Sequence, residues 1–325
     1  MPAAKRAWPR GAGNEGSLAH QIRFTVQAGL ARDQRTGLAW LQNLSPLAEP
    51  CFWGEALERV AGLNQRVYLG YSDWRLPNRR ELVSLIDYAQ ARPALPAGHP
   101  FVGLELAWYW SATSYAGDPA YAWYLHLEGG RLFYGDKGRS YFLLPVRGSS
   151  ASLAASGQIR CYGAAGAALP CAGSGQDGEL RLGRPWPQPR FTAQGPVVQD
   201  NLTGLVWARA ADLGPGPMSW FEAGQAAAAL NQRGLGGLGG WRLPSIQELE
   251  LLVDAAAHHP ALPAGHPFVG VQEQYWSATS SGFDPEWAMA LYLDKGGIGV
   301  GQKKDAHYCV WAVSGGESRG KGKKY

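Results

Sequence analysis

The segment DWRLPNRRELVSLID at residues 73–87 returns later in the chain as GWRLPSIQELELLVD at residues 240–254. In both copies an Asn or Ser directly follows the proline, and a Glu lies three residues further on. This spacing is the capping box that begins an α-helix. Apolar residues then recur three and four positions apart, which predicts a helix with one face against a hydrophobic core. The sequence therefore predicts the same capped helix twice and a fold built by duplication.

Matched segments extend outward from both copies of this helix. The offset between them is 167 residues up to Gly103 and 166 residues from YWSATS onward. A period of this length indicates two tandem globular domains rather than the short units of a solenoid. The matched pairs are RFTVQAGLARDQRTGLAWLQ (23–42) with RFTAQGPVVQDNLTGLVWAR (190–209), WGEALERVAGLNQR (53–66) with WFEAGQAAAALNQR (220–233), PALPAGHPFVG at 93–103 and 260–270, and YWSATS from 109 and from 275.

The repeat divides the chain into two predicted domains, at residues 21–149 and 187–316. In each, a hairpin comes first, a helix follows, the capped helix is next, and short strands with Gly-rich turns end the domain. This order predicts the α+β class, with two helices and short antiparallel strands per domain. The Gly- and Ala-rich residues 150–186 are predicted to be a linker with a small hairpin, and residues 1–20 and 317–325 are basic tails.

The net positive charge of the chain comes from its two ends. The formal net charge is +4, and the +3 of residues 1–10 and the +3 of residues 317–325 leave −2 for residues 11–316. This near-neutral core argues against a nucleic-acid-binding protein with a basic face. The tails are interpreted as solvated ends that could still bind phosphate, sulfated glycans or acidic lipids weakly.

The cysteines and the hydropathy of the chain bear on its compartment. Cys161 and Cys171 bracket the stretch CYGAAGAALPC, and they could close a disulfide in an oxidising compartment or remain two reduced thiols. No segment has the length of a transmembrane span, and the N-terminus shows no apolar signal-peptide region. The localisation is therefore left open between an intracellular protein, another export route and a chain that naturally begins elsewhere.

The order TGLxW, helix, WRLPxxxEL, YWSATS and a terminal strand pair occurs twice and resembles the Lcl C-terminal domain family. The segments SGQIRCYGAAGAALPCAGSGQDGEL and RPWPQPRFT between the copies are also similar to that family. The resemblance implies a C-type-lectin-like fold that displays variable loops, distantly similar to formylglycine-generating enzymes and retroelement-diversified binding proteins. In the bacterial adhesin that gives the family its name, the domain binds sulfated glycans and forms trimers. A glycan or protein ligand, a homo-oligomer and an extracellular or cell-surface location are thus implied, although this chain has no collagen-like stretch.

The two copies differ most in their last strands, where a lectin-like fold is expected to bind ligands. Aromatic rings offer flat apolar faces to sugars or proteins, and Arg and Lys offer charge-assisted hydrogen bonds. The alternative is that every second strand residue belongs to the core and the others have drifted. The candidate ligand-binding residues are Tyr121, Trp123, Tyr124, His126, Arg131, Tyr134 and Arg139 in the first copy, and Trp287, Tyr292, Lys295, Lys303 and His307 in the second, with Tyr115, Tyr141, Phe283, Met289, Lys304 and Tyr308 in the same segments.

An enzymatic function finds less support in these residues. A formylglycine-generating type of enzyme needs two active-site cysteines late in the domain, yet no cysteine follows Cys51 in the first copy and the second has only Cys309. His99 and His266 lie in the duplicated loop PALPAGHPFVG without a Cys, Asp or Glu at ligand spacing, so no catalytic residue, metal or cofactor is predicted. We interpret this loop as a rigid connector that sets where the last strands begin.

The sequence thus predicts a non-enzymatic ligand-binding protein of adhesion type. The alternative is a structural subunit of a surface or phage-related assembly. Two predictions about packing accompany this one. Arg75 and Arg242, each fixed between a Trp and a Leu, are expected in buried or half-buried ion pairs. The tryptophans expected in or beside the cores are Trp40, Trp74, Trp110, Trp207, Trp241 and Trp276.

Overall fold

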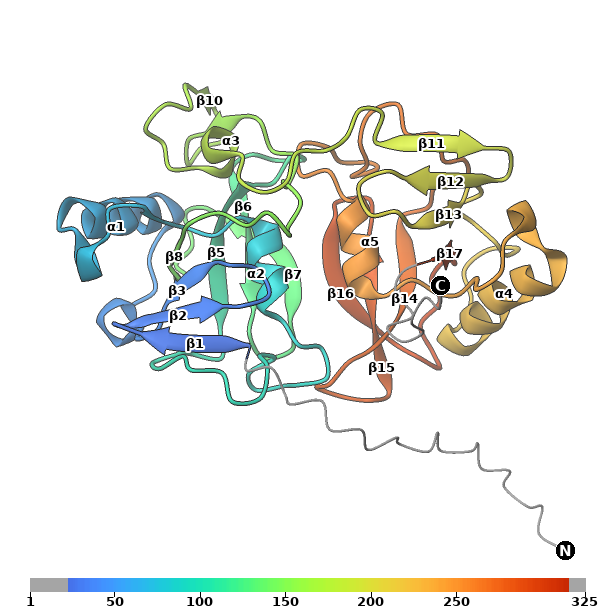
Figure 1. Ribbon diagram of the computed structural model, residues 1–325, viewed down its shortest axis with the longest axis horizontal. Helices are drawn as coiled ribbons and strands as arrows, with labels where there is room; N and C mark the ends of the chain where they lie inside the picture. The colour runs from blue at the N-terminus through green and yellow to red at the C-terminus, as the bar shows by residue number, and fades with distance from the viewer. Residues whose placement is uncertain (1–22, 316–325) are drawn as a thin grey trace, which may run out of the picture.

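The computed structural model describes residues 23–315, which form two α+β domains that lie side by side (Figure 1). The basic tails predicted at residues 1–20 and 317–325 lie outside the described residues. The paired strands of the four sheets are antiparallel, and each domain has two main helices, which confirms the predicted class and element order. None of the helices within the described range combines the length and the apolar character needed to cross a bilayer.

The first domain closes its opening hairpin with a strand from its far end, in a sheet of order β1-β2-β3-β8-β4. Its three long strands belong to a second sheet. The elements are β1 (Phe24–Gln27), β2 (Leu30–Asp33), β3 (Ala39–Leu41), η1 (Ser45–Leu47), α1 (Trp53–Gln65), η2 (Tyr68–Gly70), β4 (Trp74–Arg75), α2 (Arg79–Leu85), β5 (Trp108–Ser114), β6 (Tyr121–His126), β7 (Arg131–Asp136) and β8 (Val146–Arg147).

The second domain repeats this arrangement with a sheet of order β11-β12-β13-β17. Its elements are β11 (Phe191–Gln194), β12 (Val197–Asp200), β13 (Val206–Ala208), α4 (Trp220–Arg233), η3 (Leu235–Gly237), α5 (Ile246–Leu252), β14 (Gln274–Ser280), β15 (Trp287–Tyr292), β16 (Gly297–Gln302) and β17 (Val313–Ser314). Between the domains lie β9 (Cys161–Tyr162), β10 (Ala168–Leu169) and α3 (Asp177–Leu180).

The capped helices form as the sequence predicts. Asn78 caps α2 and Ser245 caps α5, each in a capping box with the Glu three residues on. The same Glu of α2, Glu81, forms two 2.7 Å hydrogen bonds with the guanidinium of Arg75. Arg242 pairs with the corresponding Glu of α5 at 2.6 Å, so both predicted arginine ion pairs are confirmed.

The six predicted core tryptophans are all buried, with at most 2% of their surface exposed. The WRLP motif places two of them through an Asn on the preceding helix. The side chain of Asn64 accepts from the amide of Trp74 at 2.6 Å and donates to its carbonyl at 2.8 Å. Asn231 holds Trp241 in the same way, at 2.8 and 2.9 Å. The motif is therefore the point where the first helix of each domain is joined to its core.

One six-stranded sheet runs through both domains, in the order β14-β15-β16-β7-β6-β5. β16 of the second domain pairs with β7 of the first, and Ile298 is opposite Leu132 at that junction. In Figure 1, α2 and α5 lie beside each other in front of this sheet. The last strands, which the sequence predicts to display ligand-binding residues, therefore also join the domains.

Residues 150–186, predicted to be a linker, form a packed unit that we call the disulfide segment. A disulfide joins Cys161 to Cys171. The buried amide of Gln158 donates to the carbonyl of Ser114 in the first domain and to that of Ala255 in the second, at 3.1 and 3.3 Å. Because a buried amide is satisfied only when both domains are in place, this segment contributes to their relative position.

Candidate binding surface

The candidate residues divide between the two faces of the six-stranded sheet, because successive side chains of a strand point to opposite faces. Trp123 and Tyr134 point to the face covered by α2 and α5, where the ring of Trp123 lies 4.1 Å from the guanidinium of Arg79. Tyr124 follows Trp123 in β6, so its side chain points to the opposite face. Tyr292 lies opposite Gly297, the neighbour of the inward-pointing Ile298, so Tyr292 points to this opposite face too.

This opposite face carries a continuous set of half-buried aromatic rings, which we call the aromatic face. Trp108 lies 4.2 Å from Tyr124 and 4.5 Å from His126 between ring centroids. Phe133 of the first domain lies 5.8 Å from Tyr292 of the second, so the rings continue across the junction. The residues of the aromatic face are Trp108, Tyr124, His126, Arg131, Phe133, Tyr141, Tyr292, Lys295 and Tyr308.

Glycines in the central strands let these rings lie flat on the sheet. A Cβ atom at Gly135 would lie 2.2 Å from Cε1 of Tyr124, and one at Gly299 would lie 2.3 Å from Cε2 of Tyr292. Such distances exclude any side chain while the rings stay in place. Gly299 and Gly301 of β16 therefore make room for aromatic rings, since a Cβ atom at Gly301 would lie 2.6 Å from Cε2 of Tyr308.

Two cations border the aromatic face. The ammonium of Lys295 lies 5.9 Å from the ring of Phe133 and pairs with Asp294 at 3.4 Å. The guanidinium of Arg131 lies 5.7 Å from the ring of Trp108. Burial and the neighbouring Arg131 lower the pKa of His126, so its imidazole is neutral at pH 7. The surface can therefore stack against flat apolar groups and attract anions at the same time.

The structure removes some candidates from this surface. Trp123 is 1% exposed, so its prediction as a ligand contact is corrected: its place on the inner face of β6 makes it a core residue. Tyr134 is stacked on Tyr115 at 3.9 Å, and Tyr121 contacts Tyr134 edge-on. Trp287 lies on the same inner face as these tyrosines, where 37% of its surface is exposed.

The remaining cations and histidine lie apart from the aromatic face. Lys303 donates to Oγ of Ser280 and to the carbonyl of Pro285, both at 2.7 Å, so its ammonium is already hydrogen bonded within the domain. Arg139 and His307 lie in exposed turns that follow β7 and β16. Sequence reasoning missed Trp108 and Phe133, although the strand period places Phe133 on one face with Arg131.

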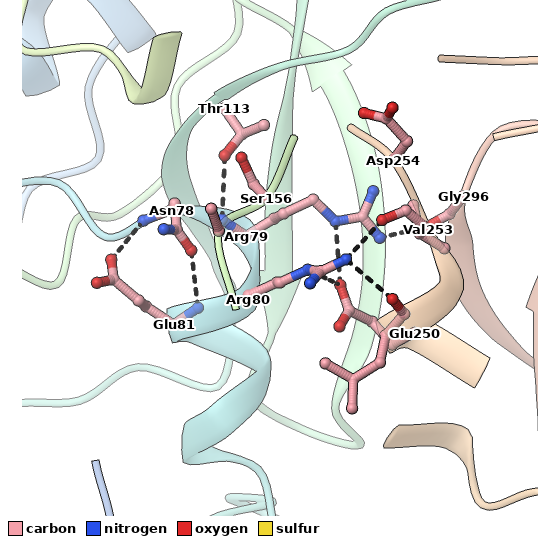
Figure 2. Close-up of polar contacts among 12 residues, drawn as sticks. Asn78, Arg79, Arg80, Glu81, Thr113, Ser156, Glu250, Val253, Asp254 and Gly296 are labelled. Atoms are coloured by element: carbon pink, nitrogen blue, oxygen red, sulfur yellow. Dashed lines mark hydrogen bonds and ion pairs between the residues drawn. The ribbon is translucent and has the colours of Figure 1, made fainter. Parts of the chain in front are cut away.

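A buried ionic cluster fixes one domain against the other (Figure 2). Arg79 and Arg80, at the start of α2, reach into the second domain, where Oε1 of Glu250 lies 3.5 and 3.6 Å from their Nε atoms. Arg80 also donates to the carbonyl of Val253 at 2.5 Å, and Arg79 donates to the carbonyl of Gly296. Burial lowers the pKa of Arg79 to about 10, and Glu250 opposes this shift, so Arg79 is charged at neutral pH.

This cluster has no counterpart by symmetry, because the copies differ at these positions. The second domain has Ile246 where the first has Arg79, and Gln247 follows it. The first domain in turn has Val83 at the position of Glu250. At this point the first copy has NRRELV and the second has SIQELE. This difference is the sequence signal that could have indicated an asymmetric contact between the domains.

A buried carboxylate anchors the disulfide segment to the first domain. Oδ2 of Asp177 accepts hydrogen bonds from Thr113 at 2.7 Å and from Ser156 at 2.6 Å. Burial raises the pKa of Asp177 to about 6, although both hydroxyl groups act to lower it. The carboxyl group is therefore largely ionised at pH 7, at a cost in desolvation.

Replacing Asp177 with Asn is expected to remove part of the pH dependence of stability. An unfolded Asp has a pKa of about 3.9, so between pH 4 and 6 the folded protein binds a proton that the unfolded chain has released. This contribution makes the free energy of unfolding fall as the pH rises through that window, by up to about 3 kcal/mol. Urea denaturation at pH 4 and 7 measures this contribution. The stability of Asp177→Asn relative to the wild type should be higher at pH 7 than at pH 4. An equal difference at both pH values would contradict the prediction.

Within residues 23–315, no group of three or more His, Cys, Asp or Glu side chains is arranged to hold a metal ion. The thiols of Cys51 and Cys309 are buried, which raises the pKa of each to about 11, so both are protonated at neutral pH. The two thiols also belong to different domains.

Comparison with known families bears on both domains. The model of the Lcl C-terminal domain matches the chain twice, at residues 29–147 and 196–314. Each match runs from the first hairpin to the closing strand of its domain, and together they cover most of the chain. No curated protein shows a significant match.

Proposed function

Since the chain belongs to the Lcl C-terminal domain family in both of its domains, we propose that it is a non-enzymatic ligand-binding protein of adhesion type. The binding surface is the aromatic face, and the ligand is a glycan with anionic groups, such as a sulfated polysaccharide. The observation that carries the proposal is the row of half-buried rings that crosses the domain junction between Arg131 and Lys295.

The chemistry of the aromatic face fits an extended sugar chain. Pyranose rings present flat C–H surfaces, which pack on aromatic rings such as Tyr124 and Phe133. The contact between Phe133 and Tyr292 makes the surface longer than one domain, so several sugar residues can bind along it. Sulfate groups on the chain would form charge-assisted hydrogen bonds with Arg131 and Lys295.

Binding of a sulfated oligosaccharide is expected to depend on both parts of this surface. Phe133→Ala removes the ring at the junction and should weaken binding about tenfold, which corresponds to about 1.4 kcal/mol. Arg131→Ala combined with Lys295→Ala should weaken binding to a similar degree and flatten its salt dependence, because fewer charges are paired. Isothermal titration calorimetry at 50 and 300 mM salt measures both effects.

Arg139→Ala is the matched control, since this exposed cation lies outside the aromatic face and its loss should leave binding unchanged. The proposal fails if the wild type binds sulfated and unsulfated oligosaccharides equally, or binds neither. Failure to bind glycans together with self-association in sedimentation would instead favour the alternative function, a structural subunit of a surface or phage-related assembly.

A further inference from the structure

A pocket of about 390 Å³ lies where the second domain meets the first. The turn after β6 forms one side with Glu128 and Gly129, and the other side comes from the inner face of β15 and β16 and the loop before β15. The residues that carry the argument are Glu128, Ser281, Phe283, Asp284, Trp287 and Val300, and Arg131 of the aromatic face also lines the pocket. Phe283 and Trp287 are 45% and 37% exposed, which is unusual for two neighbouring large aromatic side chains.

The first domain shows what fills the corresponding space. The amide of Tyr115 donates to the carbonyl of Tyr121 at 2.9 Å, and the amide of Ser281 donates to that of Trp287 at 2.9 Å, so Ser281 occupies the place of Tyr115. Val300 lies opposite Met289, the third residue of β15, and Tyr134 lies opposite Trp123, the third residue of β6. Val300 therefore occupies the place of Tyr134.

In the first domain these two tyrosines form a parallel stack. The rings of Tyr115 and Tyr134 lie 3.9 Å apart with an angle of 6° between their planes. Gly117 takes the place of Phe283, since a Cβ atom there would lie 2.4 Å from the hydroxyl of Tyr115. The second domain has Ser and Val instead of the two phenol side chains, and the pocket is the volume that they leave.

The same comparison indicates the polarity of an occupant. Burial, contact with Tyr134 and the nearby carboxylates of Asp294 and Asp118 raise the pKa of Tyr115 to about 12. The phenol of the first domain thus lies near two acids. Their counterparts at the pocket are Glu128 and Asp284, and Glu128 is oriented by an ion pair with Arg92 at 3.4 Å.

The mouth of the pocket also differs from its counterpart. In the first domain the disulfide segment packs on the turn before β6, where a Cβ atom at Gly166 would lie 2.8 Å from the amide nitrogen of Ala120. The corresponding turn of the second domain, with Pro285 and Glu286, is exposed. A ligand can therefore enter the pocket of the second domain from solvent.

We propose that this pocket binds a small planar aromatic ligand that carries a hydrogen-bond donor, such as a phenol or an arylalkylamine. Its ring stacks between Phe283 and Trp287 in the volume that Tyr115 and Tyr134 fill in the first domain. Its donor group faces the carboxylates of Glu128 and Asp284. This site lies on the inner face of the sheet and shares only Arg131 with the aromatic face.

The test uses phenol, tyramine and anisole as probes with the full chain, in saturation-transfer NMR and calorimetry. Phenol and tyramine are expected to bind with one site per chain, and anisole at least tenfold more weakly because it has no hydroxyl group to donate to the two carboxylates. The combined variant Ser281→Tyr with Val300→Tyr supplies the first domain's own side chains. It should lose tyramine binding by tenfold or more while sulfated-glycan binding stays unchanged.

The reciprocal variant, Tyr115→Ser with Tyr134→Val, should leave the stoichiometry at one, because Gly117 supplies no stacking wall and the disulfide segment covers that place. A third variant, Phe283→Gly, removes one stacking wall and covers the case in which the tyrosine variant does not fold. The proposal is overturned if millimolar phenol and tyramine fail to bind the wild type, if anisole binds as well as phenol, or if filling the pocket leaves binding unchanged.

Discussion

Replacing Glu250 with Val is expected to destabilise the protein by about 3–5 kcal/mol, because it leaves two buried cations without their carboxylate. The side chains of Arg79 and Arg80 are only 1% and 3% exposed, and Oε1 of Glu250 lies 3.5 and 3.6 Å from their Nε atoms. The guanidinium groups would keep their bonds to the carbonyls of Gly296 and Val253. Those carbonyl dipoles do not neutralise two charges in a low-dielectric interior.

The chain itself supplies a rescue for this variant. Arg79→Ile and Arg80→Gln introduce the residues of the second domain, and Glu250→Val introduces Val83 of the first. A buried ion pair contributes little net stability once both charges are removed together, so the triple variant should recover more than half of the loss. Urea denaturation of both variants measures this. Glu286→Val, at an exposed position, is the control and should change stability by less than about 0.5 kcal/mol.

A small loss in the single variant, or a triple variant no more stable than the single one, would contradict this account of the cluster. The outcome also bears on ligand binding. The contact between Phe133 and Tyr292 depends on how the two domains meet, so a loosened junction should also weaken the glycan binding that we propose.

The features that the sequence predicts correctly are local ones. The capping boxes of α2 and α5 involve residues three positions apart, and the ion pair from Arg75 to Glu81 spans six. Such contacts join residues within one short stretch around the start of the helix, so their spacing is visible in the sequence. Burial of the WRLP tryptophans follows because the capped helix must cover an apolar core.

The features that the sequence does not reveal concern contacts between distant segments. The strand period shows that Trp123 and Tyr124 point to opposite faces, but which face is covered depends on α2 and α5 packing on a shared sheet. Pairing of β16 with β7 leaves no mark within either copy, because both copies have the same strand pattern. The composition of residues 150–186 resembles a linker, whereas the anchoring of Asp177 depends on a hydroxyl in β5.

Replacing Glu81 with Ala is expected to cost about 3–5 kcal/mol, and the same change at Glu248 only about 1–2 kcal/mol. The two residues make the same bonds: each completes a capping box and each pairs with the arginine of WRLP. They differ in exposure. The side chains of Arg75 and Glu81 are 8% and 3% exposed, whereas those of Arg242 and Glu248 are 42% and 18% exposed. Water can solvate Arg242 after the carboxylate is lost, but it cannot reach Arg75 to the same extent.

Comparison of the two variants by urea denaturation separates the helix cap from the buried charge. Both variants lose the helix cap, so the loss of stability in Glu248→Ala measures mainly the cap. The additional loss in Glu81→Ala measures the cost of leaving the guanidinium of Arg75 without its carboxylate. Adding Arg75→Met to Glu81→Ala removes that charge and should return the cost to about that of Glu248→Ala. Equal losses at the two positions would show instead that the cap dominates, and that burial of the first WRLP arginine contributes little to the stability of its domain.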